Sequence, residues 1–139
     1  MKAVKAHELG GPEVLKIEDI PIPFPGKGEV LVEVHAASIN PIDTKLLRSD
    51  PSYQHAGENP VTPGFDLAGA VVEIGESVKH LRVGDNVYGQ GAVIRKGTGA
   101  FAEYAVTPED SIARMPDNIS FTEAAAVPLS ACSAYQALI

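Results

Sequence analysis

The chain has 139 residues, 45% of them hydrophobic, which is enough for one domain with a buried core. Eleven Lys and Arg against eighteen Asp and Glu give a net charge of −7, which argues against a nucleic-acid partner because phosphate backbones attract concentrated positive charge. The single cysteine cannot form an internal disulfide, and no apolar stretch has the length of a membrane span or a secretory signal. We therefore expect a cytoplasmic protein without a nucleic-acid or membrane partner.

Most of the chain has the pattern of short strands separated by Gly and Pro turns. The clearest strand covers residues 29–38, where Val30, Val32 and Val34 recur at period two and make one face drier than the other. Further strands are expected over residues 2–8, 14–23, 67–75, 85–89, 101–108 and 111–116. Short strands in series with such turns predict a barrel or a sandwich.

Two segments are predicted to be helical. The first, residues 40–49, has Asn40 at the cap position, Pro41 at the first helical position and an acidic residue in the first turn. The second begins at Ser120, which forms a capping-box pattern with Glu123. Pro128 is expected to break or restart this helix, which then continues over residues 129–139.

The end of the chain lacks the usual signals of a helix C-terminus. It closes on Ala137, Leu138 and Ile139 without a glycine, a basic last turn or a proline. This pattern predicts that the 139 residues are the front part of a longer protein, with a complete small protein as the alternative.

One apparent nucleotide motif does not have the context that its chemistry needs. Residues 97–102, GTGAFA, match the dinucleotide fingerprint, in which a strand precedes the glycines and a helix follows to hold the pyrophosphate. Here a strand-like segment follows instead, so we interpret the glycines as turn residues. The sequence also contains no Walker loop, nucleophile elbow or Cys–His pair.

Five segments in fixed order resemble the medium-chain dehydrogenase/reductase superfamily, and most closely its zinc-free quinone oxidoreductase branch. They are GPEVLKIEDIPIP (11–23), GEVLVEVHAASINPID (28–43), PGFDLAGAVVEIGESVKHLRVGDNVYG (63–89), GAFAEYAV (99–106) and AAAVPLSACSAYQAL (124–138). The resemblance implies a mainly β fold with short helices, a GroES-like, partly open antiparallel β-barrel. Residues 1–118 would form this catalytic, substrate-side domain. Residues 119–139 would be a helical connector to a Rossmann domain that binds NADPH and lies outside this chain.

The resemblance also implies that the chain holds no zinc. Zinc-dependent members bind their catalytic metal at positions that correspond here to Asn40, Phe65 and Leu129. A tetrahedral zinc site needs three protein ligands and a water, and neither Phe65 nor Leu129 offers a lone pair. Phe65 in place of a histidine makes this region more apolar and suits stacking on a flat conjugated substrate.

The implied function is NADPH-dependent hydride transfer to a quinone or an enone, which are small hydrophobic conjugated substrates, by a protein that is a homodimer at full length. The developing oxygen charge would take hydrogen bonds from the protein, the cofactor or water. A non-enzymatic GroES-like binding or scaffold module and a zinc-free enoyl reductase are the alternatives. The isolated 139-residue chain is expected to be inactive.

Three candidate residues each have a functional and a structural interpretation. The resemblance implies that Asn40 faces the nicotinamide and substrate cleft and donates through its amide; the structural interpretation is an ordinary helix cap, and the two roles are compatible. Tyr53 lies over the substrate, or it is a surface loop tyrosine. Ser133 contacts the cofactor through its hydroxyl, or it is a small helix residue that faces the sheet.

Four other polar residues are predicted to be structural. Asp66, at the start of a strand after Pro-Gly, is expected in a turn or an ion pair. Asp43 and Lys45 are expected on the solvated face of the first helix. Cys132 is expected to be a buried small apolar residue, because no basic residue adjoins it in the sequence.

Overall fold

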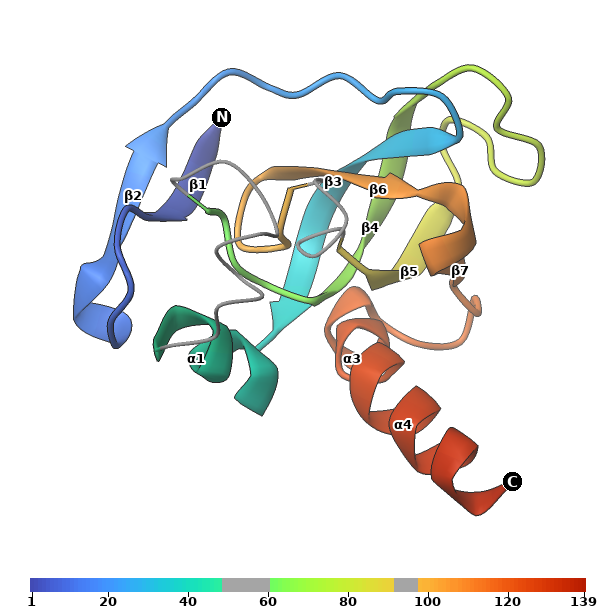
Figure 1. Cartoon of the computed structure of the whole chain (residues 1–139). Coiled ribbons are helices and arrows are strands. Elements are labelled where there is room, and N and C mark those ends of the chain that lie inside the picture. Colours follow the sequence, from blue (N-terminus) through green and yellow to red (C-terminus); the bar gives the residue numbers. More distant parts are fainter. Residues whose placement is uncertain (49–60, 92–97) are drawn as a thin grey trace.

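The computed structural model describes residues 1–48, 61–91 and 98–139. Strands dominate this part of the chain, and the helices are short (Figure 1). The strands are β1 (Lys2–Ala6), β2 (Leu15–Asp19), β3 (Glu29–Ser38), β4 (Asp66–Ile74), β5 (Asn86–Gln90), β6 (Tyr104–Pro108) and β7 (Ile112–Arg114). The α-helices are α1 (Pro41–Arg48), α3 (Phe121–Ala125) and α4 (Pro128–Leu138), and single 3₁₀ turns, η1 and η3, cover Pro12–Val14 and Glu109–Ser111.

The strands form two antiparallel sheets. The larger has the order β6-β3-β4-β5-β7, and the smaller pairs β1 with β2. Isolated bridges from Ala3 to Ala102 and from Ala6 to Val61 join the small sheet to the rest. In the described part of the chain the larger sheet stays open rather than closing into a barrel. The predicted mainly β fold with short helices is confirmed.

The core lies on one face of the larger sheet. Val30 and Val32 of β3 are fully buried and pack in one cluster with Leu67, Val71 and Val87 of the neighbouring strands. Burying each such side chain contributes about 1.5–3 kcal/mol. The predicted alternation in β3 is interrupted by irregular register at two points, and Leu31, on the predicted wetter face, is buried as well.

Helix α3 packs against β3 and β4 through small residues. Ala124 and Ala125 are buried against Ala68 of β4, which lets the helix approach the sheet closely. The predicted capping box is confirmed, because Ser120 and Glu123 each accept a hydrogen bond from the other's backbone N–H. The predicted restart at Pro128 is also confirmed, since α4 begins there.

Four predicted strands, β1, β2, β6 and β7, are shorter than expected. β2 ends at Asp19, before the prolines that follow it. β6 begins at Tyr104 because the N–H groups of Ala100 and Phe101 bond to the carbonyls of Gly64 and Pro63 instead of entering the ladder. No helix forms over residues 98–103, which agrees with the rejection of the dinucleotide fingerprint.

None of the described helices combines the length and the apolar character that crossing a lipid bilayer requires.

Candidate active site

The chain turns sharply at Pro63-Gly64 immediately before β4. Gly64 has φ +105°, and a Cβ at this position would lie 2.7 Å from the backbone nitrogen of Phe101. Glycine is therefore required both by the left-handed backbone and by the close approach of residues 100–101. This corner delivers Phe65 and Asp66 to the start of β4 with opposite surroundings.

Phe65 lies in a small apolar cluster between α1 and the corner. Its side chain is buried and packs with Leu46, Ile42 and Val61. Its side-chain neighbours in this cluster are apolar, as expected for this region. Contact between the Phe65 ring and a substrate stays a prediction.

Asp66 is fully buried and forms a compact triangle of polar groups with Ser38 and Asn40. Its Oδ2 accepts hydrogen bonds from the Ser38 hydroxyl and the Asn40 Nδ2, each at 3.1 Å, and Nδ2 lies 3.1 Å from the Ser38 oxygen. An ionised carboxylate can only accept, so the nitrogen of the Asn40 amide must face Asp66. The Asn40 amide nitrogen carries two hydrogens and donates to two acceptors, the Ser38 hydroxyl oxygen and Asp66 Oδ2.

The same carboxylate also binds the first turn of α4. The backbone N–H of Leu129 donates to Oδ1 at 3.1 Å and Oδ2 at 3.3 Å of Asp66. This N–H belongs to the first turn, where no partner exists within a helix, and Val127 before the helix supplies no side-chain cap. Asp66 therefore caps α4 from 63 positions away in the chain.

Asp43 of α1 is a second buried carboxyl group beside this cluster. Its Oδ2 accepts a hydrogen bond from the Asn40 N–H at 2.8 Å, whereas Oδ1 is buried without a hydrogen-bond partner among the described residues. Burial raises the pKa of Asp43, and the Asp66 charge adds to this, against an opposing effect of the N–H groups of Asn40, Gly64 and Phe65.

The predicted solvated position of Asp43 is wrong, because it lies on the inner face of α1, within one turn of Leu46 and Leu47. Lys45 is exposed, as predicted.

Burial also raises the pKa of Asp66, although the hydrogen bonds from Asn40, Leu129 and Ser38 oppose it. None of the ion pairs among the described residues includes Asp66, and its side chain binds Ser38, Asn40 and Leu129 instead of a neighbouring turn residue, so neither form of the predicted role is observed. A buried carboxyl group costs free energy in its charged form unless it is well hydrogen-bonded. Two such groups with raised pKa values in one corner are typical of a functional site.

The structure brings some of the predicted residues together. Asn40 is buried, and its side chain and the Leu129 N–H meet on Asp66, so two of the three positions that correspond to zinc ligands share one carboxylate. The Asn40 side chain bonds sideways to Ser38 and Asp66 rather than to the first turn of α1, so it is more than an ordinary helix cap.

The remaining predicted residues lie apart from this cluster. Ser133 is exposed one turn beyond Leu129 on α4 and does not face the sheet as a buried small residue would. Cys132 is exposed as well, so its predicted burial is wrong; its side chain lines an open hollow between α4 and β5 instead of packing in the core. Tyr53 lies outside the described residues.

Sequence reasoning missed the central position of Asp66 and the burial of Asp43. The spacing of Asn40 and Asp43 matches that of a cap and its third helical residue, and this signal could have identified the bond between them. No local pattern connects Asp66 with Leu129, because their contact depends on the packing of α4 near the start of β4.

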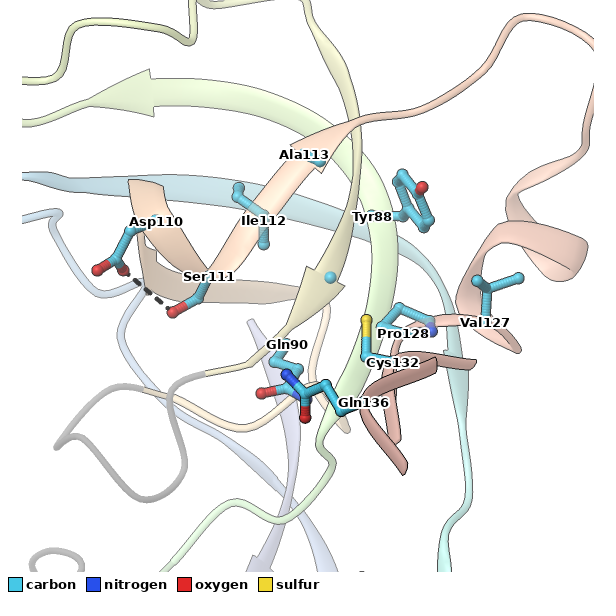
Figure 2. A pocket seen from close by; sticks show the side chains of 11 residues that line it. Tyr88, Gln90, Asp110, Ser111, Ile112, Ala113, Val127, Pro128, Cys132 and Gln136 are labelled. Atoms are coloured by element: carbon cyan, nitrogen blue, oxygen red, sulfur yellow. Dashed lines mark hydrogen bonds between the residues drawn. The ribbon is translucent and has the colours of Figure 1, made fainter. Parts of the chain in front are cut away.

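A hollow of about 410 Å³ lies beside this cluster, between α4 and the strands β5 and β7. Figure 2 shows Pro128, Cys132 and Gln136 of α4 facing Gln90 at the end of β5. Gln90 pairs with Asp66 across the sheet, so the hollow and the Asp66 cluster both adjoin the first turn of α4. Its lining offers amide groups and a thiol but no cluster of charges.

The residues at the positions that correspond to zinc ligands do not fit a metal. Only the Asn40 amide among these three side chains carries a polar atom, and Asp66 already accepts three hydrogen bonds. Within residues 1–48, 61–91 and 98–139, no three His, Cys, Asp or Glu side chains gather as a metal site would require.

Comparisons with known proteins agree with this fold. Residues 26–117 match the family model of the alcohol dehydrogenase GroES-like domain. The chain is 36% identical to human quinone oxidoreductase over 140 residues, covering 100% of this chain and 41% of that protein. It is 38% identical to 2-methylene-furan-3-one reductase of Solanum lycopersicum over 143 residues, covering 99% of this chain and 37% of that protein.

A crystal structure of Escherichia coli quinone oxidoreductase complexed with NADPH matches with a TM-score of 0.85 and 33% identity, over 99% of this chain and 40% of that one. This chain spans about two fifths of the length of the curated relatives that it matches. Together with the open antiparallel sheet, these matches show that the chain belongs to the medium-chain dehydrogenase/reductase superfamily, in its quinone oxidoreductase-like branch, as an alcohol dehydrogenase GroES-like domain.

Proposed function

We propose that this chain is the substrate-side part of an NADPH-dependent oxidoreductase that reduces a quinone or a conjugated enone without zinc. The observation that carries the proposal is that Asn40 and the Leu129 N–H, at two of the three positions that correspond to zinc ligands, both donate hydrogen bonds to Asp66. These groups form a closed hydrogen-bonded unit in place of a metal donor set. The similarity to quinone oxidoreductases and to a furanone reductase supports the substrate class.

A bound NADPH would supply the hydride. The Asn40 amide nitrogen donates to Asp66 and to the Ser38 hydroxyl oxygen, and the hydrogen on the Ser38 side would instead stabilise oxygen charge that develops on the acceptor. Phe65 and its apolar neighbours keep water away from this side of the site. The exposed Ser133 hydroxyl, one turn beyond Leu129, is available to a nicotinamide.

The test is NADPH oxidation by the full-length protein with a panel of quinones and enones, together with measurement of its zinc content. We expect turnover that a chelator does not reduce. Asn40→Ala should lower kcat/KM by about 100-fold, the loss typical of one oxyanion hydrogen-bond donor. Asn40→Asp is the matched variant, because it keeps the size but replaces the donor by a charge, and it should be similarly impaired.

Three outcomes would contradict the proposal. Stoichiometric zinc with loss of activity on its removal would show metal catalysis. Undiminished turnover by Asn40→Ala would show that the Asn40 amide is not the donor that stabilises the developing charge. Absence of turnover with every acceptor would favour the binding or scaffold alternative.

The proposal also covers the activity of the isolated chain, the oligomeric state and the cellular compartment. We expect no NADPH turnover by the 139 residues alone, because the nucleotide would be held mainly by a Rossmann domain outside this chain. The full-length protein is proposed to be a cytoplasmic homodimer, which light scattering at full length would check. Quinone reduction by the isolated chain would contradict the proposal that a separate Rossmann domain holds the NADPH.

A further inference from the structure

We propose that Asp66 is a positioning residue whose carboxylate holds the Asn40 amide and the first turn of α4 as one unit, so that both respond together when it gains a proton. This inference rests on the proposed function for its catalytic consequence, but its structural part stands independently. The evidence is a set of four hydrogen bonds that the buried Asp66 carboxylate accepts from Ser38, Asn40 and Leu129.

Three hydrogen-bond donors surround the Asp66 carboxylate. The ionised carboxylate accepts from the Ser38 hydroxyl, the Asn40 amide and the Leu129 N–H, and it donates nothing. This set fixes the orientation of the Asn40 amide, because the amide oxygen would be repelled by a carboxylate. The direction in which the Asn40 amide donates is therefore held through Asp66.

A proton gained by Asp66 changes which hydrogen bonds its carboxyl group can accept. A protonated carboxyl group carries a hydroxyl donor on one oxygen, so it cannot accept from all three partners in the same geometry. Oδ2 is shared by Ser38, Asn40 and Leu129, and Oδ1 is bonded to Leu129. Protonation at either oxygen therefore disturbs the Leu129 contact, and at Oδ2 it also disturbs the Asn40 contact, which lets the amide turn its oxygen toward Asp66.

The charged groups near Asp66 influence its protonation. Asp43 on α1 is the charged group of the described chain that interacts electrostatically with Asp66. The neighbouring positions on the other elements that pack there, Ser38 on β3, Gln90 on β5 and Leu129 on α4, carry no charge. Because no described cation pairs with Asp66, burial raises its pKa toward the range in which the protonation can be observed.

NMR of the isotope-labelled chain tests the coupling without any substitution. The signals to follow during a pH titration are the side-chain amide of Asn40 and the backbone amide of Leu129. We expect both to shift with one common midpoint, above the ordinary aspartate value of about 3.9. Different midpoints for the two signals, or no shift in either, would overturn the proposal.

Two variants separate Asp66 from its neighbour. Asp66→Asn should abolish the shared titration, because an amide does not titrate in this range, whereas Asp43→Asn should retain it. A shared titration that persists in Asp66→Asn would assign it to another group and overturn the inference. If Asp66→Asn does not fold, the wild-type titration and Asp43→Asn still decide the question.

Kinetics of the full-length protein test the catalytic consequence. Asp66→Asn should lower kcat by about 10- to 100-fold, the scale of a misplaced catalytic group, with little change in KM. The acidic limb of the wild-type pH profile should disappear in this variant. An unchanged kcat would show that the coupling does not position Asn40 for turnover. Lack of wild-type turnover would refute the proposed function instead, while the NMR result would still decide the coupling.

Discussion

Helices α3 and α4 follow one another in the chain, yet their N-termini are capped in opposite ways. The cap of α3 is local, with Ser120 and Glu123 bonding to each other's backbone within four residues. The cap of α4 comes from Asp66, a residue of β4. Both caps place a carboxylate at a helix N-terminus, where the partial positive charge of the helix favours an anion.

The two carboxylates differ in their exposure and therefore in their energetics. Glu123 is exposed, and its hydrogen bonds from the Ser120 backbone and hydroxyl lower its pKa, so the ionised form stabilises the fold. Asp66 is buried, and burial raises its pKa, so the ionised form is held at a cost. The exposed local cap of α3 stabilises the fold. A buried carboxyl group with a raised pKa, such as the one that caps α4 from far away in the chain, is typical of a functional site.

Removing the distant cap should have the largest effect. Asp66→Ala removes the acceptor of the Ser38 hydroxyl and of the Leu129 N–H and one of the two acceptors of the Asn40 amide, while it also relieves the desolvation of the carboxylate. We expect a net loss of about 2 kcal/mol in the free energy of unfolding, because unsatisfied buried donors outweigh that relief. Denaturant unfolding measures the change, with the exposed Asp117→Ala as control. A loss as small as that of the control would mean that water replaces the carboxylate.

Removing the local cap should have a smaller effect. Ser120→Ala deletes the oxygen that accepts from the Glu123 N–H at 3.3 Å, and loss of a Ser cap typically costs about 1 kcal/mol. The same unfolding experiment applies, with the exposed Thr122→Ala as matched control inside α3. If Ser120→Ala proved more damaging than Asp66→Ala, the order of the two caps would be reversed.

The smallest effect, and the sharpest comparison, is the dependence of stability on pH. The lowered pKa of Glu123 contributes stability above its ordinary range that is lost as pH falls, so Glu123→Gln should be destabilised at neutral pH and approach the wild type in acid. The raised pKa of Asp66 has the opposite sign: its contribution is present below the ordinary range and lost as pH rises. Asp66→Asn should therefore gain on the wild type as pH rises.

Unfolding free energies from about pH 4 to about pH 8 for the wild type and these two variants would measure both slopes. Parallel curves for the two variants would show that the carboxylates are energetically alike. That result would remove the contrast between the caps.

The short-range patterns of the sequence predicted most of the elements. The valines of β3, the restart at Pro128 and the capping box at Ser120 were readable because each depends on residues within a few positions of one another. The ends of β2 and β6 were less accurate, since they depend on where a partner strand stops pairing or, for β6, on the corner at Gly64.

The candidate site was only partly predictable. Asn40 and Phe65 were identified through the resemblance, and both are buried at the corner before β4. Asp43 was expected in solvent because a carboxylate is usually exposed, although Leu46 and Leu47 three and four positions later mark the same face of α1 as the inner one. Cys132 is apolar enough for a core, but it is exposed and lines the open hollow between α4 and β5, a placement that its neighbours in sequence do not reveal.

The amino-acid sequence alone determined the mainly β character, the positions of the turns and helix starts, and the lack of metal donors at Phe65 and Leu129, because these follow from local propensity and side-chain chemistry. Only the tertiary structure decided that Asp66 binds Asn40 and α4 together. That contact joins residues far apart in the chain, and it exists because folding brings the start of β4 and the first turn of α4 within hydrogen-bond distance.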